Sequence, residues 1–455
     1  MASRRQFLRG SVSLLTATVF LHLLQACGTP QGTSSGATPK SAATLTPPSQ
    51  TGAQATQAPS KASAATAETK IAFWALSTGS LNEALQGAVD QFVAQNPDVQ
   101  VEVNCMGVAE FYQKVPVAFM GGIAPEVLWL GYGQVGTYQA SKWLAPIDDV
   151  IRPWPDIDDF EKFSIDWSLV NGRPYGVLFG NPYPFYLRAD WYREAGLDPD
   201  APPKNWDEVR ATARRLVKRD GGRVMRGGVE VPTKNGDQGL ASWAWTHGAK
   251  NFYDAEGMPL YTSKEVVETL EFLVSMVHDE KLTVPSEAVT AAGTALRQGL
   301  AAQGFDASTA LPGLSQAAGS SAVRLALPPA NPETKALMLG SAFCLSSQIS
   351  SSKKSGAAVR LFKHLCSPES AWSIHMANSH IPPRKSLRDR LAKANPQNPT
   401  LLRVFENAYG WPLFGNFVQS RQILIDNLDA IYLGQVSAKE GLARAAEETK
   451  KLPKM

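Results

Sequence analysis

The sequence predicts an α/β fold with mainly parallel strand pairing. After residue 69, runs of strand length that are apolar or strictly alternating are separated by stretches with helical periodicity. The composition agrees: 44% of the 455 residues are hydrophobic, 19% are charged, and the net charge is +3. These values suit a globular body of two or three domains and give no electrostatic signature of nucleic-acid binding.

Three strands and two helices are predicted at the start of this body. Residues 71–74 are a short apolar run, residues 99–103 alternate strictly, and residues 126–130 form a third apolar run. Between them, the apolar spacing predicts helices over residues 82–96 and 111–120. Proline or glycine follows both helices and ends them. Strands that alternate with helices favour a sheet with helices packed on its faces.

The rest of the body is predicted to be mixed in the same way. Residues 172–177 predict a turn into a crossing strand, and residues 293–319 are too rich in small residues to assign. No internal repeat is present. Further helices are predicted at residues 190–195, from Trp206, and at residues 262–280, 357–366, 416–433 and 438–452.

The first 27 residues predict an export signal. A basic segment with Arg4 and Arg5 precedes an apolar stretch, residues 12–24, that is too short to span a membrane. The paired arginines resemble a bacterial twin-arginine (Tat) signal, although a basic segment also serves general secretion. Residues 24–27 resemble the lipobox of bacterial lipoproteins. That resemblance implies a signal peptide over residues 1–26 and lipidation of Cys27. The alternative is an ordinary membrane anchor with a chance cysteine.

Residues 27–69 predict a disordered tether. Thr, Ser, Pro, Ala, Gly and Gln dominate the segment, which has no aromatic residue and one large aliphatic residue, Leu45. Such a composition cannot bury enough apolar surface to offset its ordering entropy. Besides Cys27, the chain has three cysteines, which allow at most one internal disulfide, and the sequence does not decide whether it forms: Cys105, Cys344 and Cys366.

Seven segments in order resemble one protein family. They are residues 73–74, 92–101, 121–127, 171–177, 194–197, 203–208 and 381–384. In this order and spacing they resemble the family 1 (sugar-type, maltose-binding-protein-like) extracellular solute-binding proteins of ABC importers. The resemblance covers nearly all of residues 70–452. It therefore concerns the whole globular body.

The resemblance implies a two-lobed periplasmic-binding-protein fold with a ligand cleft between the lobes. Lobe one would hold residues 70–177 with 335–378, and lobe two residues 178–334 with 379–455. A ligand that touches both lobes favours the closed state, which a membrane permease then recognises. The chain would be a monomeric binding lipoprotein without cofactor or metal. It would be anchored at the outer face of the cytoplasmic membrane, at the cell surface or in a periplasm.

The expected ligand is an uncharged carbohydrate, most simply an oligosaccharide. The glycerol-phosphate-binding branch of the family carries an arginine two residues before the glycine that corresponds to Gly415, and this chain has Leu413 there. The alternatives are a glycerol phosphate, a glycerophosphodiester or another small solute, and a sensor rather than a transport role. An exported glycan-acting enzyme is a further alternative, with Asp166, Asp190 and Asp306 as possible carboxylates. No Gly-x-Ser-x-Gly, His-Glu-x-x-His or P-loop motif is present.

Candidate ligand contacts are aromatic platforms for a sugar face and polar groups for its hydroxyls. Core packing, helix capping and a surface salt bridge are the structural alternatives. Trp243 and Trp245 are two residues apart, so on a helix only one readily faces the cleft. The aromatic candidates are Trp74, Tyr132, Tyr183, Trp243, Trp245, Phe305 and Trp411, and the polar candidates are Ser77, Thr78, Glu83, Asn181, Asp306 and Arg384.

Overall fold

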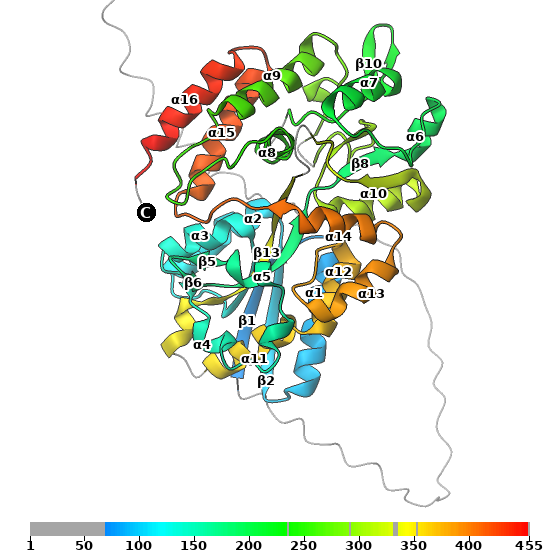
Figure 1. The fold of residues 1–455 in the computed structure, drawn as a ribbon. Helices are drawn as coiled ribbons and strands as arrows, with labels where there is room; N and C mark the ends of the chain where they lie inside the picture. Colours follow the sequence, from blue (N-terminus) through cyan, green and yellow to red (C-terminus); the bar gives the residue numbers. More distant parts are fainter. Residues whose placement is uncertain (1–68, 234–235, 291–292, 331–334, 352–353, 454–455) are drawn as a thin grey trace, which may run out of the picture. The chain divides into compact units, whose positions relative to one another are not determined.

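Two β-sheets divide the globular body into two lobes (Figure 1). The computed structural model describes residues 69–233, 236–290, 293–330, 335–351 and 354–453, which belong to one unit, residues 64–455. The predicted signal peptide, Cys27 and the tether up to residue 68 lie outside the described residues. Thr69, which was assigned to the tether, is the first residue of strand β1.

The larger sheet has seven strands, in the order β14-β13-β3-β1-β2, with β4 and β7 also paired to β13. β1 runs parallel to β2 and β3, as expected, whereas β13 runs antiparallel to β3, β4 and β7. Apart from the short parallel pair of β13 and β14, the expectation of mainly parallel pairing is therefore wrong beyond the first three strands. β13 returns from the other lobe instead of following a strand–helix crossover, so it enters in the opposite direction. The bounds are β1 (Thr69–Leu76), β2 (Val99–Met106), β3 (Val127–Gly131), β4 (Leu144–Ala145), β7 (Val177–Pro182), β13 (Ala336–Ser346) and β14 (Ala408–Tyr409).

Both faces of this sheet are covered by helices. α1 (Ser80–Gln95), α11 (Ser355–Leu365) and α12 (Pro368–Asn378) share one apolar core, in which Phe73, Trp129 and Phe343 are fully buried. α2 (Val108–Met120) and α3 (Tyr132–Ala140) contribute to the core of the other face. Alternating strand residues point to opposite faces, which is why neighbouring β3 residues belong to different cores.

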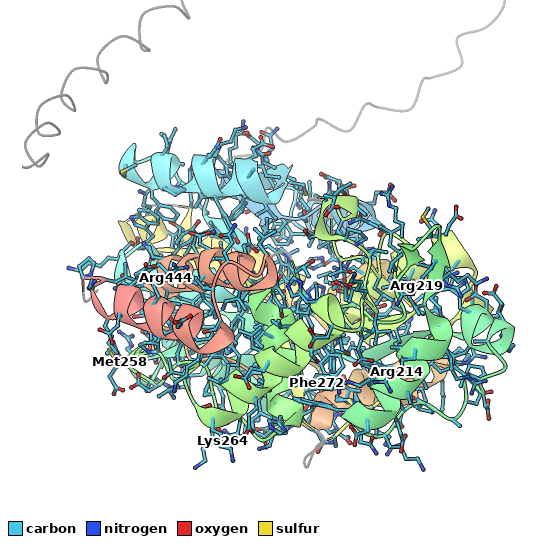
Figure 2. All side chains as sticks on the ribbon, turned by 90° about the horizontal axis from the view of Figure 1, so that it is seen from above. Arg214, Arg219, Met258, Lys264, Phe272 and Arg444 are labelled. Carbon is cyan, nitrogen blue, oxygen red and sulfur yellow. The ribbon has the colours of Figure 1, made fainter. Side chains whose placement is uncertain are left out.

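The smaller sheet has three antiparallel strands, with β8 (Phe185–Arg188) between β11 (Gln303–Phe305) and β12 (Val323–Ala326). Its helices include α8 (Asp237–Thr246), α9 (Lys264–His278), α15 (Phe417–Tyr432) and α16 (Ala438–Lys450). Seen from above, α9 residues Lys264 and Phe272 lie between Met258 on one side and Arg214 on the other (Figure 2).

The remaining elements are short or peripheral. They are α4 (Asp148–Ile151), η1 (Ile157–Asp159), α5 (Lys162–Asp166), β5 (Leu169–Val170), β6 (Arg173–Pro174), α6 (Ala189–Glu194), α7 (Trp206–Leu216), β9 (Lys218–Asp220), β10 (Arg223–Arg226), η2 (Ser286–Ala288), η3 (Ser308–Ala310), α10 (Leu311–Ala318), η4 (Ser320–Ala322), η5 (Ser347–Ser351), η6 (Lys385–Leu387), α13 (Arg388–Ala394) and α14 (Asn398–Glu406).

The chain passes between the two sheets at short connections. β7 of the larger sheet runs into β8 of the smaller one through Tyr183-Pro184, and the chain returns into β13 after β12. The α/β fold with two lobes is thus as the sequence predicted, whereas the lobe boundaries drawn from the sequence remain a prediction. Within the described ranges, no helix is both long enough and apolar enough to cross a membrane.

Candidate functional site

A cavity of about 180 Å³ opens beside the connection from β7 to β8, and we call it the wall pocket. α8 supplies Gln238 and Trp243, and the end of β11 supplies Phe305 and Asp306. Trp243 and Phe305 pack edge to face, with ring centroids 5.2 Å apart. The lining residues are Tyr183, Glu230, Pro232, Gln238, Gly239, Trp243, Gly293, Thr294, Arg297, Phe305 and Asp306.

Asp306 is held in the wall pocket by a bidentate ion pair with Arg297. Arg297 donates from Nε to Oδ2 at 2.9 Å and from Nη2 to Oδ1 at 2.6 Å. Thr294 donates its hydroxyl to Oδ2 at 2.8 Å, and the N–H of Ala307 donates to Oδ1 at 2.7 Å. A buried carboxylate with this many donors is fixed in position, and its charge is compensated by that of Arg297.

Glu230 is the second carboxyl group of the wall pocket, and it is buried. Burial raises its pKa to about 8, and the nearby charge of Asp306 acts in the same direction, whereas backbone N–H groups at Leu296 and Ala295 oppose the shift. The N–H of Leu296 donates to Oε2 at 2.9 Å. With this pKa, Glu230 is mostly protonated and uncharged at neutral pH.

A second buried ion pair lies next to the wall pocket. Arg421 of α15 donates from Nη2 to Oδ1 of Asp237 at 3.0 Å, and Asp237 is the first residue of α8. The next residue, Gln238, accepts the hydroxyl of Tyr183 at 2.6 Å. The positive charge of Arg421 opposes the burial that raises the pKa values of Tyr183 and of Tyr112.

Tyr112 connects this region to the larger sheet, since it belongs to α2. Its hydroxyl accepts the side-chain N–H of Gln134 in α3 at 2.6 Å. Arg421 therefore lies within electrostatic reach of tyrosines on both sides of the lobe junction. The Arg421 pair beside the wall pocket is thus close to a hydrogen-bonded pair of polar side chains on α2 and α3.

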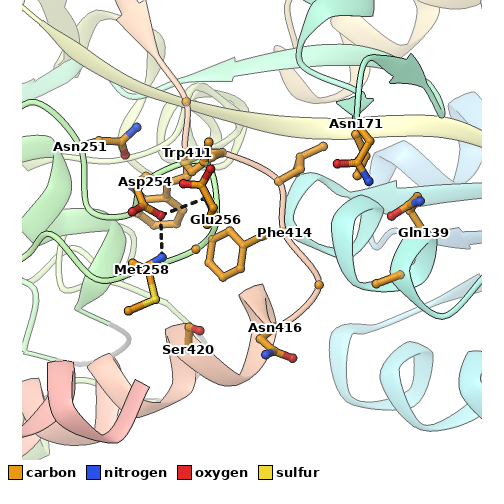
Figure 3. A pocket seen from close by; sticks show the side chains of 18 of the residues that line it. Gln139, Asn171, Asn251, Asp254, Glu256, Met258, Trp411, Phe414, Asn416 and Ser420 are labelled. Carbon is orange, nitrogen blue, oxygen red and sulfur yellow. Dashed lines mark hydrogen bonds between the residues drawn. The ribbon is translucent and has the colours of Figure 1, made fainter. Parts of the chain in front are cut away.

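A second cavity, of about 970 Å³, is lined by the segment that leads into α15 (Figure 3). We call it the linker groove. None of its lining residues also lines the wall pocket. Tyr132 donates its hydroxyl to the carbonyl oxygen of Trp411 at its floor. The lining residues include Tyr132, Gln139, Trp167, Asn171, Asn251, Asp254, Glu256, Met258, Trp411, Phe414, Asn416, Ser420 and Lys450.

The predicted site residues fall into separate groups. Tyr183, Trp243, Phe305 and Asp306 line the wall pocket together. Tyr132 and Trp411 line the linker groove instead. Their role in ligand binding remains a prediction.

Asn181 and the β1–α1 residues line neither cavity. The Asn181 side-chain oxygen accepts the Ser308 hydroxyl at 2.9 Å, which joins β7 to the second lobe. Ser77 donates its hydroxyl to Asn82 at 2.8 Å, within the turn before α1. The remaining members of this group are Trp74, which is half-buried, and Thr78 and Glu83, which are exposed.

Trp245 and Arg384 are enclosed in the protein. Trp245 lies on α8 with Trp243, and both pack into the core with 1% of their surface exposed, but Trp245 does not line the wall pocket. The guanidinium of Arg384 lies 3.7 Å from the ring centroid of Phe160, donates to the carbonyl of Cys366 at 2.9 Å, and pairs with Asp156. These contacts match the structural alternatives of core packing and a salt bridge, although Arg384 is buried rather than on the surface.

Sequence reasoning missed Glu230, Gln238, Arg297 and Arg421. Glu230 and Arg297 reach Asp306 from loops that are distant from it or irregular, so no periodicity marks them. The described cysteines Cys105, Cys344 and Cys366 are free thiols. Cys344 and Cys366 belong to the cores on opposite faces of the larger sheet.

Comparison with known proteins gives one family and two kinds of relatives. A family model described as "Bacterial extracellular solute-binding protein" matches residues 78–369. A probable amino-acid ABC transporter periplasmic-binding protein, y4oP of Sinorhizobium fredii, is 30% identical over 208 residues, which are 44% of this chain and 46% of that protein. The sn-glycerol-3-phosphate-binding periplasmic protein UgpB of Escherichia coli is 30% identical over 159 residues, which are 33% of this chain and 36% of that protein. The matched part is less than half the length of either relative.

Solved structures of similar fold align over nearly their whole length. A solute-binding protein of Thermotoga lettingae bound with alpha-D-tagatose has a TM-score of 0.75 at 19% identity, covering 84% of this chain and 99% of that one. Maltose-bound MalE3 of T. maritima has a TM-score of 0.73 at 23% identity, with coverages of 84% and 99%. At these identities, the similarity shows the two-lobed fold.

Proposed function

The chain belongs to the bacterial extracellular solute-binding protein family, and on that premise we propose that it captures an uncharged carbohydrate between its lobes for an ABC importer. The observation that supports this ligand class is the charge balance of the wall pocket. Among its described lining residues, Arg297 is paired with Asp306, and Glu230, with a pKa of about 8, is mostly uncharged at neutral pH. A neutral ligand fits such a wall better than an ion does.

The remaining lining groups suit a polyhydroxylated ring. Tyr183, Gln238 and Thr294 offer hydroxyl and amide groups that donate and accept hydrogen bonds. Trp243 and Phe305 offer apolar surface for the C–H face of a sugar. Opposite them, Tyr112 and Gln134 of the first lobe are positioned to contact the same ligand when the lobes close.

The main alternative ligand is a glycerol phosphate or related phosphate ester, because UgpB is among the relatives. A phosphate would need an uncompensated cation. Arg297 and Arg421 are both engaged with buried aspartates, and Leu413 stands where the phosphate-binding branch has arginine. The proposed role is non-enzymatic, since the carboxylate of Asp306 is tied to Arg297 and is not exposed as a nucleophile or base.

The proposal extends to the N-terminal segment and to partners. Residues 1–26 would direct export, Cys27 would carry the lipid anchor, and the tether would let a monomeric body reach the permease. Replacing Cys27 by Ser should release the protein from membranes or leave it unprocessed. Detection by mass spectrometry of a cleaved but unmodified Cys27 would contradict the anchor.

Thermal unfolding of the purified mature chain with a ligand panel tests the proposed function. The panel holds neutral mono- and oligosaccharides, polyols, amino acids and glycerol phosphates. A bound ligand raises the melting temperature by mass action, so at least one neutral sugar should do so. Analysis of the recovered sugar should show it unchanged. Stabilisation by a phosphate ester alone would support the alternative, and cleavage of the sugar would indicate an enzyme.

A further inference from the structure

The linker groove is the larger of the two cavities described above, and the proposed capture of a ligand at the wall pocket does not use it. Its volume of about 970 Å³ lies at the upper end of the range of small-molecule sites, about 300–1,000 Å³. Figure 3 shows Gln139 and Asn171 on one side and Asn251, Asp254 and Met258 on the other. The groove is therefore built from segments that are distant in sequence.

A tight junction of α3 and α15 lies beside the linker groove. Gly133 and Gly136 of α3 face the start of α15, where an added Cβ would lie 2.2 Å from the ring of Phe417 and 2.8 Å from the backbone of Phe414. Consecutive residues of α15 then serve different cavities, because Ser420 lines the groove whereas Arg421 pairs with Asp237 beside the wall pocket. A ligand in one cavity does not occupy the other.

The groove is lined by aromatic and amide side chains. Trp167 is half-buried, with Tyr132 packed 6.3 Å from it by ring centroids. Asn171 is exposed, and Asn251 and Asn416 are half-buried on other segments. Asn251 offers its amide N–H groups, since its Oδ1 accepts the N–H of Phe252 at 2.8 Å, and Asn416 offers its Oδ1, since its Nδ2 donates to the carbonyl of Pro453. The indole face of Trp167 offers apolar surface. Together these are the groups that a sugar needs.

The charged groups of the groove are largely engaged elsewhere. Asp166 pairs with Lys162. The Oδ1 atom of Asp254 accepts the N–H groups of Glu256 at 3.0 Å and Met258 at 2.8 Å, and so shapes its own loop. Lys450 pairs with Glu447. Glu256 also lines the groove, so three carboxylates, Asp166, Asp254 and Glu256, stand beside one lysine, Lys450, and this surplus of negative charge disfavours an anionic ligand.

We propose that the linker groove is a second binding site, which takes a neutral carbohydrate chain on Trp167 and the amides of Asn171, Asn251 and Asn416. The volume of about 970 Å³ suits several linked sugar units better than a single ring. The site would hold a glycan chain at the protein surface, separately from the solute in the wall pocket.

Calorimetric titration of the purified chain with maltohexaose, cellohexaose and mannohexaose tests this proposal. At least one hexasaccharide should bind, and Trp167→Leu should weaken that binding about tenfold or more, as loss of a central aromatic contact does. Trp372→Leu is the matched control, because Trp372 is also half-buried, lies under Arg390, and lines neither cavity. That control should bind as the unaltered chain does.

A second variant guards against misfolding. Asn171 has a φ of 51°, which glycine adopts without strain, so Asn171→Gly should fold and still lose affinity. Tyr183→Phe alters the wall pocket and should leave hexasaccharide binding at the linker groove unchanged. Failure of the proposed function at the wall pocket can therefore be distinguished from failure of this proposal. The proposal is overturned if no hexasaccharide binds, or if Trp167→Leu and Asn171→Gly leave all hexasaccharide binding intact.

Discussion

The wall pocket and the linker groove differ in size and in how firmly their polar groups are held. The wall pocket is small, about 180 Å³, and its polar groups are fixed by the ion pair between buried Asp306 and exposed Arg297 and by the buried carboxyl group of Glu230. The groove is several times larger, and its amides lie on partly exposed loops and helix ends. Polar groups that are already held in place lose little conformational freedom when a ligand binds, and they reject a ligand that fits poorly. Less constrained groups adapt to more ligands, but ordering them costs entropy. The difference predicts a selective pocket and a permissive groove.

The largest expected effect comes from breaking the ion pair beside the wall pocket. Arg421→Met leaves Asp237, 0% exposed, without its cation, and should lower the free energy of unfolding by about 3 kcal/mol. Arg173→Met removes an exposed partner of Asp148 and should cost about 0–1 kcal/mol. Urea denaturation of both variants measures the contrast. Equal losses would show that the Asp237 pair is no more important than a surface contact.

The next largest effect is on ligand affinity at the wall pocket. Tyr183→Phe removes the hydroxyl that donates a hydrogen bond to Gln238. It should weaken binding of the neutral sugar proposed for the wall pocket by about tenfold, or roughly 1.4 kcal/mol. Tyr186→Phe is the control, because its hydroxyl donates to the carbonyl of Ala307 at 2.9 Å and it does not line the pocket. Calorimetry should show a loss for Tyr183→Phe alone. Equal affinities for the two variants would remove Tyr183 from the site.

The buried carboxyl group of Glu230 gives the wall pocket a pH dependence. Glu230 has a folded pKa of about 8 against an ordinary value of 4.5, so the folded state holds the proton more tightly. Its stabilising contribution is full below pH 4.5 and is lost progressively as the pH rises towards about 8. Glu230→Gln keeps the uncharged shape, so its melting temperature should fall less over that window. Parallel melting curves for both proteins would show that Glu230 titrates normally.

The smallest effect concerns a predicted site residue outside both cavities. Glu83 is exposed on α1 and lines neither the wall pocket nor the linker groove. Glu83→Ala should change sugar affinity and stability very little, as surface substitutions do. Calorimetry on this variant and on Tyr183→Phe gives the comparison. A loss at Glu83 as large as at Tyr183 would mean that the ligand reaches the β1–α1 turn.

Amphipathic helices could be predicted from the sequence because their periodicity is local. The prediction over residues 262–280 corresponds to α9 (Lys264–His278), and that over 438–452 to α16 (Ala438–Lys450). α8 (Asp237–Thr246) was not predicted, because most of its residues are buried and it has no polar stripe. β13 (Ala336–Ser346) was also missed, since Gly, Ser and Ala interrupt it and its pairing partners are all distant in sequence.

The candidate site was only partly predictable for the same reason. Asp306, Trp243 and Tyr183 were found by their type and by the family resemblance, and they line one pocket. Glu230 and Arg297 have no local signature, because Arg297 pairs with Asp306, and Glu230 comes near it, only through the tertiary fold. Trp245 shares α8 with Trp243, and both are buried in the core, but only Trp243 also lines the wall pocket, which residue type alone could not show.

The neutral character of the wall pocket is the central claim, and the salt dependence of binding tests it most directly. Calorimetric titration of the purified chain with the best neutral sugar and with glycerol 3-phosphate, repeated over increasing salt, compares the two ligand classes. Salt screens a charged ligand and leaves a neutral one unaffected. We expect the sugar to bind with an affinity that does not change with salt, and the phosphate ester to bind weakly throughout. Tight binding of glycerol 3-phosphate that weakens with salt, without any response to sugars, would contradict the account.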